Sequence, residues 1–173
     1  MKEPMVITMA REYASGGSEI AQAVADKLGI PLYNKELITL AAKKSGLTEE
    51  AIAASENQRS GSLIYSLYMM GNTMPLADQV YILQSNVIKE LAAQGPCVIL
   101  GRCADEILRE AGMESLNVFI HADAVHRAVR ASELTGCTDA TELQKIIAKK
   151  DNSRHTYYNH YTGKKWGDSH NYH

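Results

Sequence analysis

Short apolar runs alternate with longer segments of helical periodicity along the chain, and this alternation predicts the class of fold. The apolar runs are four or five residues long and lack polar alternation, which is typical of strands buried on both faces of a sheet. The predicted strands are residues 5–9, 30–33, 97–100 and 116–120.

Helical spacing of apolar residues predicts the segments that connect these runs. The predicted helices cover residues 18–29, 35–46, 48–54, 75–94, 101–112 (after an initial turn), 124–136 and a last helix from 139 toward 158. Asn34 and Asp123 stand at capping positions, and Asp139 with Glu142 has capping-box spacing. Residues 56–73 mix polar turn residues with an apolar patch, which favours a mobile loop around a short helix. An irregular surface connection is the alternative there.

Strands that alternate with helices predict an α/β fold, in which a parallel sheet is covered by helices on both faces. Ligands of such sheets bind beyond the carboxyl ends of the strands. The length of 173 residues suits one domain. No closing strand follows the last predicted helix, so we expect either a four-stranded sheet or a piece of a longer protein, and we favour the second.

The composition excludes several classes of function. Apolar residues make up 45% of the chain and charged residues 22%, as in ordinary soluble proteins. A net charge of −2 gives no sign of a nucleic-acid or membrane surface, and no window approaches the roughly 18 apolar residues of a membrane span. The odd set of Cys97, Cys103 and Cys137 lacks metal-ligand spacing and indicates reduced thiols or buried small side chains. We therefore expect a cytoplasmic protein with small-molecule partners.

A glycine-rich loop between the first strand and the first helix is the first candidate site. Ser15, Gly16, Gly17 and Ser18 occupy the turn where unpaired backbone N–H groups at a helix start favour an anion. Glycines let the backbone approach a phosphate closely, and the serines can cap the helix or donate to phosphate oxygens. The alternative is a plain turn between strand and helix.

The loop lacks two residues that phosphate chemistry ordinarily uses. In a P-loop, a lysine reaches the phosphates and the next Ser or Thr binds Mg²⁺. Gly17 and Glu19 occupy those places here. Arg11 is the nearest cation in the sequence, and we expect it to replace the lysine. The alternative is that Arg11 pairs with a carboxylate such as Glu19.

Two further groups of arginines follow predicted strands or lie on late helices. Arg102, after Gly101, is expected to project into the ligand crevice, where its planar guanidinium suits phosphate. A salt bridge from Arg102 to Asp105 or Glu106 is the alternative. The late arginines favour a lid that closes cations over phosphates. They are Arg127 and Arg130 on one helix and Arg154 on the next. Lys164 and Lys165 belong to the same basic segment, and for them a solvated helix face and loose tail is the alternative.

Together these segments resemble the cytidylate kinase-like branch of the P-loop nucleoside monophosphate kinases. The resemblance covers nearly the whole chain and rests on four stretches. They are ITMAREYASGGSEIAQAVADKLGIPLYNKELI, VILGRCADEIL, VFIHADAVHRAVR and DNSRHTYYNHYTGKKWGD. It implies a three-layer P-loop kinase-like fold and phosphoryl transfer from ATP to a nucleoside monophosphate, with Mg²⁺ as cofactor.

The resemblance also implies roles for individual residues. Asp151 and Arg154 resemble a D-x-x-R element of the lid, and Asn34 lies where the family carries an aspartate at the substrate site. The expected catalytic residues are Arg130, Asp151 and Arg154. The expected phosphate and ATP-binding residues are Arg11, Ser15, Gly16, Gly17 and Ser18. The expected substrate-binding residues are Asn34, Gly101, Arg102, Asp105 and Arg127. No metal-ligand set is predicted.

The chain departs from the family pattern at further positions. Leu100 replaces a carboxylate before Gly-Arg, and residues 56–72 replace a nucleotide-specificity insert. Family members typically continue with another strand and helix, which we expect this chain to lack. We expect one domain over 1–173, with a substrate-side helical segment at about 35–95 and a lid at about 123–167. The expected function is a kinase for CMP or a similar monophosphate. The alternative is a non-catalytic nucleotide sensor or interaction module, whereas a dinucleotide-binding oxidoreductase would need a G-x-G-x-x-G that is missing.

Overall fold

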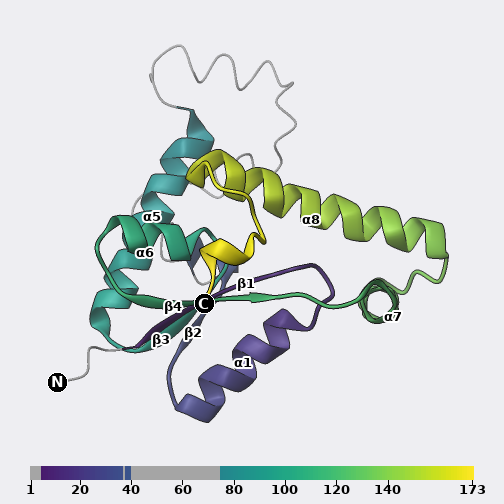
Figure 1. The fold of residues 1–173 in the computed structure, drawn as a ribbon, viewed down its shortest axis with the longest axis horizontal. Helices are drawn as coiled ribbons and strands as arrows, with labels where there is room; N and C mark the ends of the chain where they lie inside the picture. Colours follow the sequence, from purple (N-terminus) through teal and green to yellow (C-terminus); the bar gives the residue numbers. More distant parts are fainter. Residues whose placement is uncertain (1–4, 37, 40–74) are drawn as a thin grey trace.

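Four parallel strands form the central sheet of the chain (Figure 1). The computed structural model describes residues 5–36, 38–39 and 75–173. Within them the strand order is β2-β3-β1-β4. The strands are β1 (Val6–Arg11), β2 (Leu32–Tyr33), β3 (Cys97–Leu100) and β4 (Ser115–Ile120). The parallel sheet that the alternating pattern predicts is therefore confirmed.

Strand boundaries follow the pairing between neighbours. β1 runs two residues beyond its predicted end because Ala10 and Arg11 stay in register with β4. β2 is shorter than the predicted run, although the carbonyl of Pro31 still accepts a hydrogen bond from the Val98 N–H at 2.9 Å. Proline has no N–H of its own, so it cannot donate to the ladder.

Helices lie on both faces of the sheet and agree with the predicted segments. They are α1 (Gly17–Leu28), α5 (Leu76–Gln94), α6 (Ala104–Glu110), α7 (Ala124–Thr135), α8 (Ala140–Thr162) and a short 3₁₀ helix, η1 (Ser169–Asn171). The Asp123 side chain accepts from the backbone of α7, and Asp139 accepts from Glu142 N, which confirms both caps. α8 extends past its predicted end to Gly163, where a left-handed residue ends it.

Part of the predicted helical region falls outside the described residues. Residues 35, 36, 38 and 39 are helical, in agreement with the helix predicted to follow Asn34. The remainder of the helix predicted at 35–46, the helix at 48–54 and the loop at 56–73 lie outside the described part of the chain.

Alternate side chains of the strands build one core on each face of the sheet. Val6, Cys97 and Ile99 pack with buried residues of α5, α6 and α8. Ile7 and Val98, from the intervening positions, pack against α1. Figure 1 shows α1 alone below the sheet, with α5, α6 and α8 above it. The arrangement is the three-layer α/β fold predicted from the sequence.

The neighbouring strands β1 and β3 send their following helices to opposite faces of the sheet. α1 follows β1 on one face, and α6 follows β3 on the other. Such a divergence opens a crevice at the carboxyl ends of the two strands, which is where parallel sheets bind ligands.

Candidate functional site

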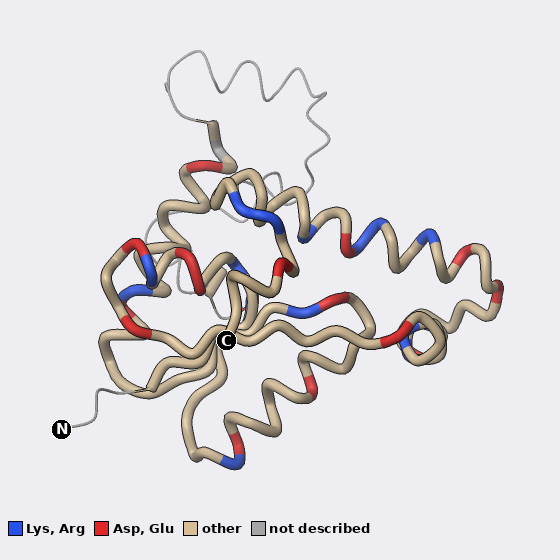
Figure 2. The backbone as a smooth tube through the Cα atoms, viewed as in Figure 1, with Lys and Arg blue, Asp and Glu red and all other residues tan. Residues whose placement is uncertain are grey.

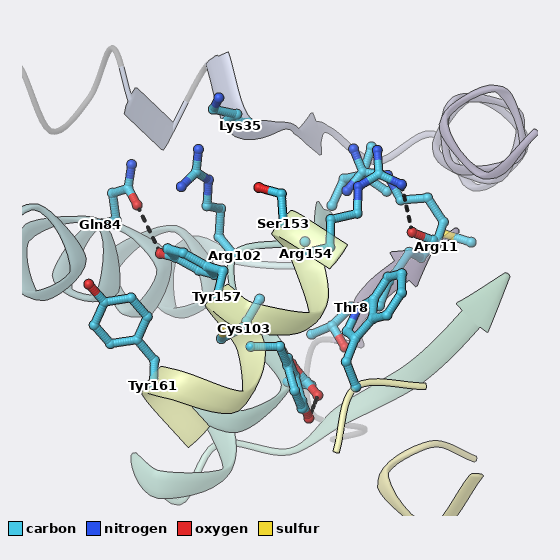
Figure 3. Close-up of a pocket in the computed structure, with 18 of the residues that line it drawn as sticks. Thr8, Arg11, Lys35, Gln84, Arg102, Cys103, Ser153, Arg154, Tyr157 and Tyr161 are labelled. Atoms are coloured by element: carbon cyan, nitrogen blue, oxygen red, sulfur yellow. Dashed lines mark hydrogen bonds between the residues drawn. The ribbon is translucent and has the colours of Figure 1, made fainter. Parts of the chain in front are cut away.

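A cavity of about 330 Å³ lies at the carboxyl ends of β1 and β3 (Figure 3). Its lining comes from both strands, the loop after β3, α5, α6 and α8. The ionisable arginine, lysine and aspartate side chains in this lining are Arg11, Lys35, Arg102, Asp105, Lys150 and Arg154. Elsewhere basic and acidic residues are interspersed along the described chain (Figure 2). The excess of cations in the cavity is therefore local, and it favours an anionic ligand.

A left-handed turn after β3 directs Arg102 into this cavity. Gly101, Arg102 and Cys103 have φ angles of 78°, 60° and 56°. This conformation costs about 1–2 kcal/mol for each residue other than glycine. The turn is anchored by a 2.9 Å hydrogen bond from Gly101 N to the carbonyl of Met9. The Arg102 Cζ atom lies 5.3 Å from the centroid of the Tyr157 ring. Strain at such a position is typical of a functional site.

The Arg11 side chain runs from the start of α1 into the same cavity. A Cβ atom built on Gly17 would lie 2.5 Å from Arg11 Cβ, and one built on Gly101 would lie 2.8 Å from Arg11 Nη1. The Nε atom of Arg11 is buried without a hydrogen-bond partner. Burial and the charge of Arg154 lower the pKa of Arg11 to about 10, although Glu36 opposes the shift. The guanidinium therefore lies where an anion would stabilise it.

Arg154, on α8, completes a group of three guanidinium groups. Its Nη1 atom donates to the carbonyl of Arg11 at 2.9 Å, the interaction drawn as a dashed line in Figure 3. Burial lowers the pKa of Arg154, and the carboxylate of Asp151, 3.9 Å away, only partly offsets this effect. Three cations from β1, the turn after β3 and α8 thus line one cavity. A phosphate group would relieve their mutual repulsion.

The loop between β1 and α1 has the backbone geometry of an anion site. Ala14 and Gly16 are left-handed, with φ of 58° and 81°. Gly16 caps α1 without a side-chain hydrogen bond to the first turn. The Ser15 hydroxyl instead donates to the carbonyl of Glu12 at 2.9 Å, and Ser18 is exposed at the helix start. The N–H groups of the first turn of α1 therefore have no side-chain cap.

The guanidinium of Arg130 lies beside Gly16 of this loop. The Cβ position of Gly16 lies 3.7 Å from Arg130 Cζ, and Arg130 Nη2 lies 2.5 Å from Glu19 Oε1. The expectation that Arg11 replaces the lysine of the loop stays a prediction. The Arg11 stem packs under Gly17, but its head group turns away into the cavity. The alternative expectation was an ion pair between Arg11 and Glu19. In the structure Glu19 pairs with Arg130 instead.

Asp151 and Arg127 are in contact with each other and with the backbone of Tyr13. Asp151 Oδ1 accepts from Tyr13 N at 2.7 Å, and Arg127 Nε donates to Tyr13 O at 2.9 Å. The Asp151 and Arg127 side chains also form an ion pair, and Arg127 Nη1 lies 3.3 Å from Glu12 Oε2. Neither side chain lines the cavity. These contacts hold α7 and α8 against the loop, so the geometry gives both residues a positioning role.

The remaining predicted substrate residues lie at the cavity or next to it. Asp105 is 7% exposed and accepts a 2.7 Å hydrogen bond from the hydroxyl of Tyr158. Burial raises the pKa of Asp105, although the Tyr158 bond opposes the rise. The Glu106 carboxylate forms ion pairs with Arg109 and Lys164, which balance its negative charge. Asn34 begins the helical turn at 35–36 and immediately precedes the cavity residue Lys35.

Sequence reasoning missed two sets of cavity residues. Gln84 is a polar residue in the apolar stripe of α5, between Val80 and Ile88. This interruption of the stripe was the signal that could have identified it. The other set lies on one face of α8, where cations and aromatic residues recur three or four positions apart. Its missed members are Lys150, Ser153, Tyr157 and Tyr161, which lie around the predicted Arg154.

Neither a metal-binding cluster nor a membrane-spanning helix occurs among the described residues. Across 5–36, 38–39 and 75–173, no group of three or more His, Cys, Asp or Glu side chains is arranged to hold a metal ion. None of the helices within those ranges has the length and apolar character needed to cross a membrane.

Comparison with known families decides the membership of the chain. The model of the cytidylate kinase-like family matches residues 6–173. The chain belongs to this family. The membership agrees with the resemblance carried by the loop, by the Gly-Arg turn and by the late arginines. It supports a nucleotide kinase-like fold, while the acceptor nucleotide stays a prediction.

Solved structures show the same fold. An uncharacterized protein from Eubacterium ventriosum ATCC 27560 is 29% identical with a TM-score of 0.73, covering 97% of this chain and 84% of that one. The shikimate kinase from Bacteroides thetaiotaomicron is 17% identical with a TM-score of 0.53, covering 90% and 82%. At that identity the second likeness concerns the fold alone. No curated protein matches the chain.

Proposed function

We propose that this member of the family is a nucleoside monophosphate kinase, which transfers the γ-phosphoryl group of ATP to CMP or a similar monophosphate. The observation that carries the proposal is the convergence of Arg11, Arg102 and Arg154 on one cavity beside the loop at the start of α1. Phosphoryl transfer needs positioning and neutralisation of charge rather than covalent help from the protein. A cavity lined by three guanidinium groups can supply both.

The acceptor phosphate binds in the cavity and the donor phosphates bind at the loop. Arg102 contacts the acceptor phosphate, since the strained turn after β3 directs it there. The backbone N–H groups of the first turn of α1, together with Arg130, hold the donor phosphates. Arg154 contacts Arg11 between these two regions and neutralises charge on the transferred group. Asp151 and Arg127 keep the proposed lid, at about 123–167 of a single domain, against the loop.

The described residues do not form a site for a resident Mg²⁺ ion. The Glu19 carboxylate of the loop pairs with Arg130. No cluster of carboxylates lies nearby within the described residues. We therefore derive no step through Mg²⁺. In this proposal the ion arrives with ATP, as it does in the family.

We also propose a cytoplasmic location. Cys97, Cys103 and Cys137 are all unpaired, and thiols that stay reduced are typical of that compartment.

One observation favours a second candidate, a non-catalytic nucleotide-binding module. The carboxylate of Glu19 holds the guanidinium of Arg130, which lies beside Gly16 of the loop. A carboxylate beside the phosphate site opposes the binding of a triphosphate. In this candidate the cavity binds a monophosphate but no transfer follows.

A coupled assay of ADP release with CMP, dCMP, UMP and AMP tests the proposal. We expect turnover with at least one monophosphate, and loss of that turnover in Arg102→Ala. The matched control is Lys145→Ala, which removes an exposed cation of α8 that does not line the cavity. Binding of a monophosphate, measured by calorimetry, without any ADP release would contradict the kinase and support the non-catalytic module.

A further inference from the structure

A buried amide lies in the core-facing stripe of α5. Gln84 is 1% exposed, and its neighbours one turn away, Val80 and Ile88, are 3% and 0% exposed. An apolar residue would continue this stripe at lower cost, since burying an amide without good hydrogen bonds is unfavourable. The presence of Gln84 there therefore needs a reason beyond packing.

The hydrogen bonds of Gln84 within the protein are long. Its Nε2 atom donates to the Thr39 hydroxyl at 3.4 Å, and its Oε1 atom accepts from the Tyr157 hydroxyl at 3.4 Å. Ordinary hydrogen bonds of these kinds are about 2.7–3.0 Å long. A glutamine amide has two N–H donors and two lone pairs on its oxygen. The described residues thus leave hydrogen-bonding capacity on both ends of this amide.

Gln84 and Arg102 line the same cavity and are linked through one side chain. Arg102 lies over the Tyr157 ring, and the hydroxyl of that ring contacts Gln84. Figure 3 shows the Gln84 and Arg102 side chains pointing into the same space, toward Lys35. The Tyr157 side chain lies between the Arg102 guanidinium and the Gln84 amide and contacts both. A single small ligand can therefore reach both groups.

Aromatic rings surround the Gln84 end of the cavity. Tyr81 stacks on Tyr161 with centroids 4.0 Å apart, and Tyr157 packs edge-on against Tyr161 at 4.8 Å. The cavity thus brings the Arg102 guanidinium and the Gln84 amide to the two sides of one tyrosine ring. This arrangement suits a ligand that carries a phosphate and a flat ring with polar atoms on its edge.

We propose that Gln84 is a specificity-determining residue, which reads the hydrogen-bonding edge of the acceptor's base. This inference rests on the proposed monophosphate site. The amide presents a donor beside an acceptor, which complements the adjacent N3 and N4 atoms of cytosine. Rotated by half a turn, it complements uracil as well.

Binding measurements on paired ligands separate reading of the base from binding of the phosphate. Calorimetry compares CMP with ribose 5-phosphate, which keeps the phosphate and lacks the base. The variant is Gln84→Met, which preserves length and removes both polar groups. We expect it to bind CMP about tenfold more weakly, equivalent to about 1.4 kcal/mol, and to bind ribose 5-phosphate within about twofold of the wild-type value. The control is Ser85→Ala, because the Ser85 hydroxyl bonds to its own helix at the Tyr81 carbonyl.

Each other result overturns the inference. Equal weakening toward both ligands would make Gln84 a packing residue, and unchanged CMP binding would leave it without a role. A wild-type protein that binds ribose 5-phosphate as tightly as CMP does not read a base, although the phosphate site survives. A wild-type protein that binds neither ligand refutes the proposed function as well. Gln84→Leu provides a second apolar variant if Gln84→Met unfolds in a thermal melt.

Discussion

Arg130 Nη2 lies 2.5 Å from Glu19 Oε1, so a residue of α7 is held across the first turn of α1. The two residues are 111 positions apart in the chain. Their side chains are 38% and 61% exposed, and an ion pair of that exposure contributes only about 0–1 kcal/mol. The pair is therefore weak enough for a phosphate to replace the carboxylate of Glu19 at Arg130.

This relationship predicts tighter nucleotide binding when the carboxylate is neutralised. We expect Glu19→Gln to bind ATP about two- to tenfold more tightly, because it removes an anion beside the phosphates and releases Arg130. Stability should change by less than about 0.5 kcal/mol, as for other exposed sites. Calorimetric titration with ATP measures the affinity. The control is Glu142→Gln, which neutralises a carboxylate of α8 that pairs with Lys145 on the same helix. Weaker ATP binding in Glu19→Gln would show that the carboxylate assists the nucleotide.

Packing against Arg11 explains why glycine occupies position 17. A Cβ atom there would lie 2.5 Å from Arg11 Cβ and 3.3 Å from Ile120 Cβ. We expect Gly17→Ala to lower the free energy of unfolding by about 1–3 kcal/mol, as overpacking does. Gly17→Lys should be at least as unstable, so a lysine cannot simply be restored to this loop. Thermal unfolding measures the effect, with exposed Ser18→Ala as control. A Gly17→Ala variant as stable as the control would mean that the loop shifts freely.

The sequence predicted the fold because each element carries its own local signal. The run 97–100 is apolar at every position and became β3, and the capping aspartates at 123 and 139 start α7 and α8 as expected. The position of Arg102 at the cavity could be predicted because it follows a buried strand. The residues directly after such a strand lie at the carboxyl edge of the sheet. These features depend on short stretches of chain.

The rest of the site depends on contacts between distant segments. Whether Arg11 or Arg130 lies beside the loop depends on how closely β1 packs under Gly17, and on where α7 lies. Nothing within either segment encodes that distance. Gln84 escaped notice because helical periodicity counts only apolar positions, and a single polar residue in the stripe does not break the pattern.

The contacts of Asp151 predict that the two late helices open together. Asp151 accepts from Tyr13 N and pairs with Arg127, so Asp151→Ala leaves a backbone donor and a guanidinium without this partner. We expect a loss of about 1–3 kcal/mol in stability. Hydrogen exchange should be faster at the amides of α7, measured with and without ATP plus monophosphate. Lys145→Ala is the control on α8. Unchanged exchange along α7 would show that other contacts hold it to the loop.

The buried carboxyl of Asp105 predicts a stability difference that depends on pH. Burial raises the pKa of Asp105 above its ordinary value, because the charged form is poorly solvated between the sheet and α8. A group with a raised pKa in the folded state stabilises the protein below its unfolded pKa. That contribution is lost as the pH rises through the folded pKa. Above the folded pKa of Asp105 the wild-type protein therefore bears the cost of a buried charge.

Asp105→Asn removes that charge at every pH. The amide oxygen can still accept the hydrogen bond that the Tyr158 hydroxyl gives to Asp105 Oδ2 at 2.7 Å. We expect the variant to be more stable than wild type at pH 7 by about 1 kcal/mol, which corresponds to about 2–4 °C in Tm for a chain of this size. The difference should shrink as the pH falls and Asp105 takes up its proton. Thermal melts between pH 7 and pH 4 measure this trend, with exposed Glu114→Gln as control. A difference that stays constant over this range, or a variant less stable at pH 7, would mean that the Asp105 charge is compensated in the folded protein.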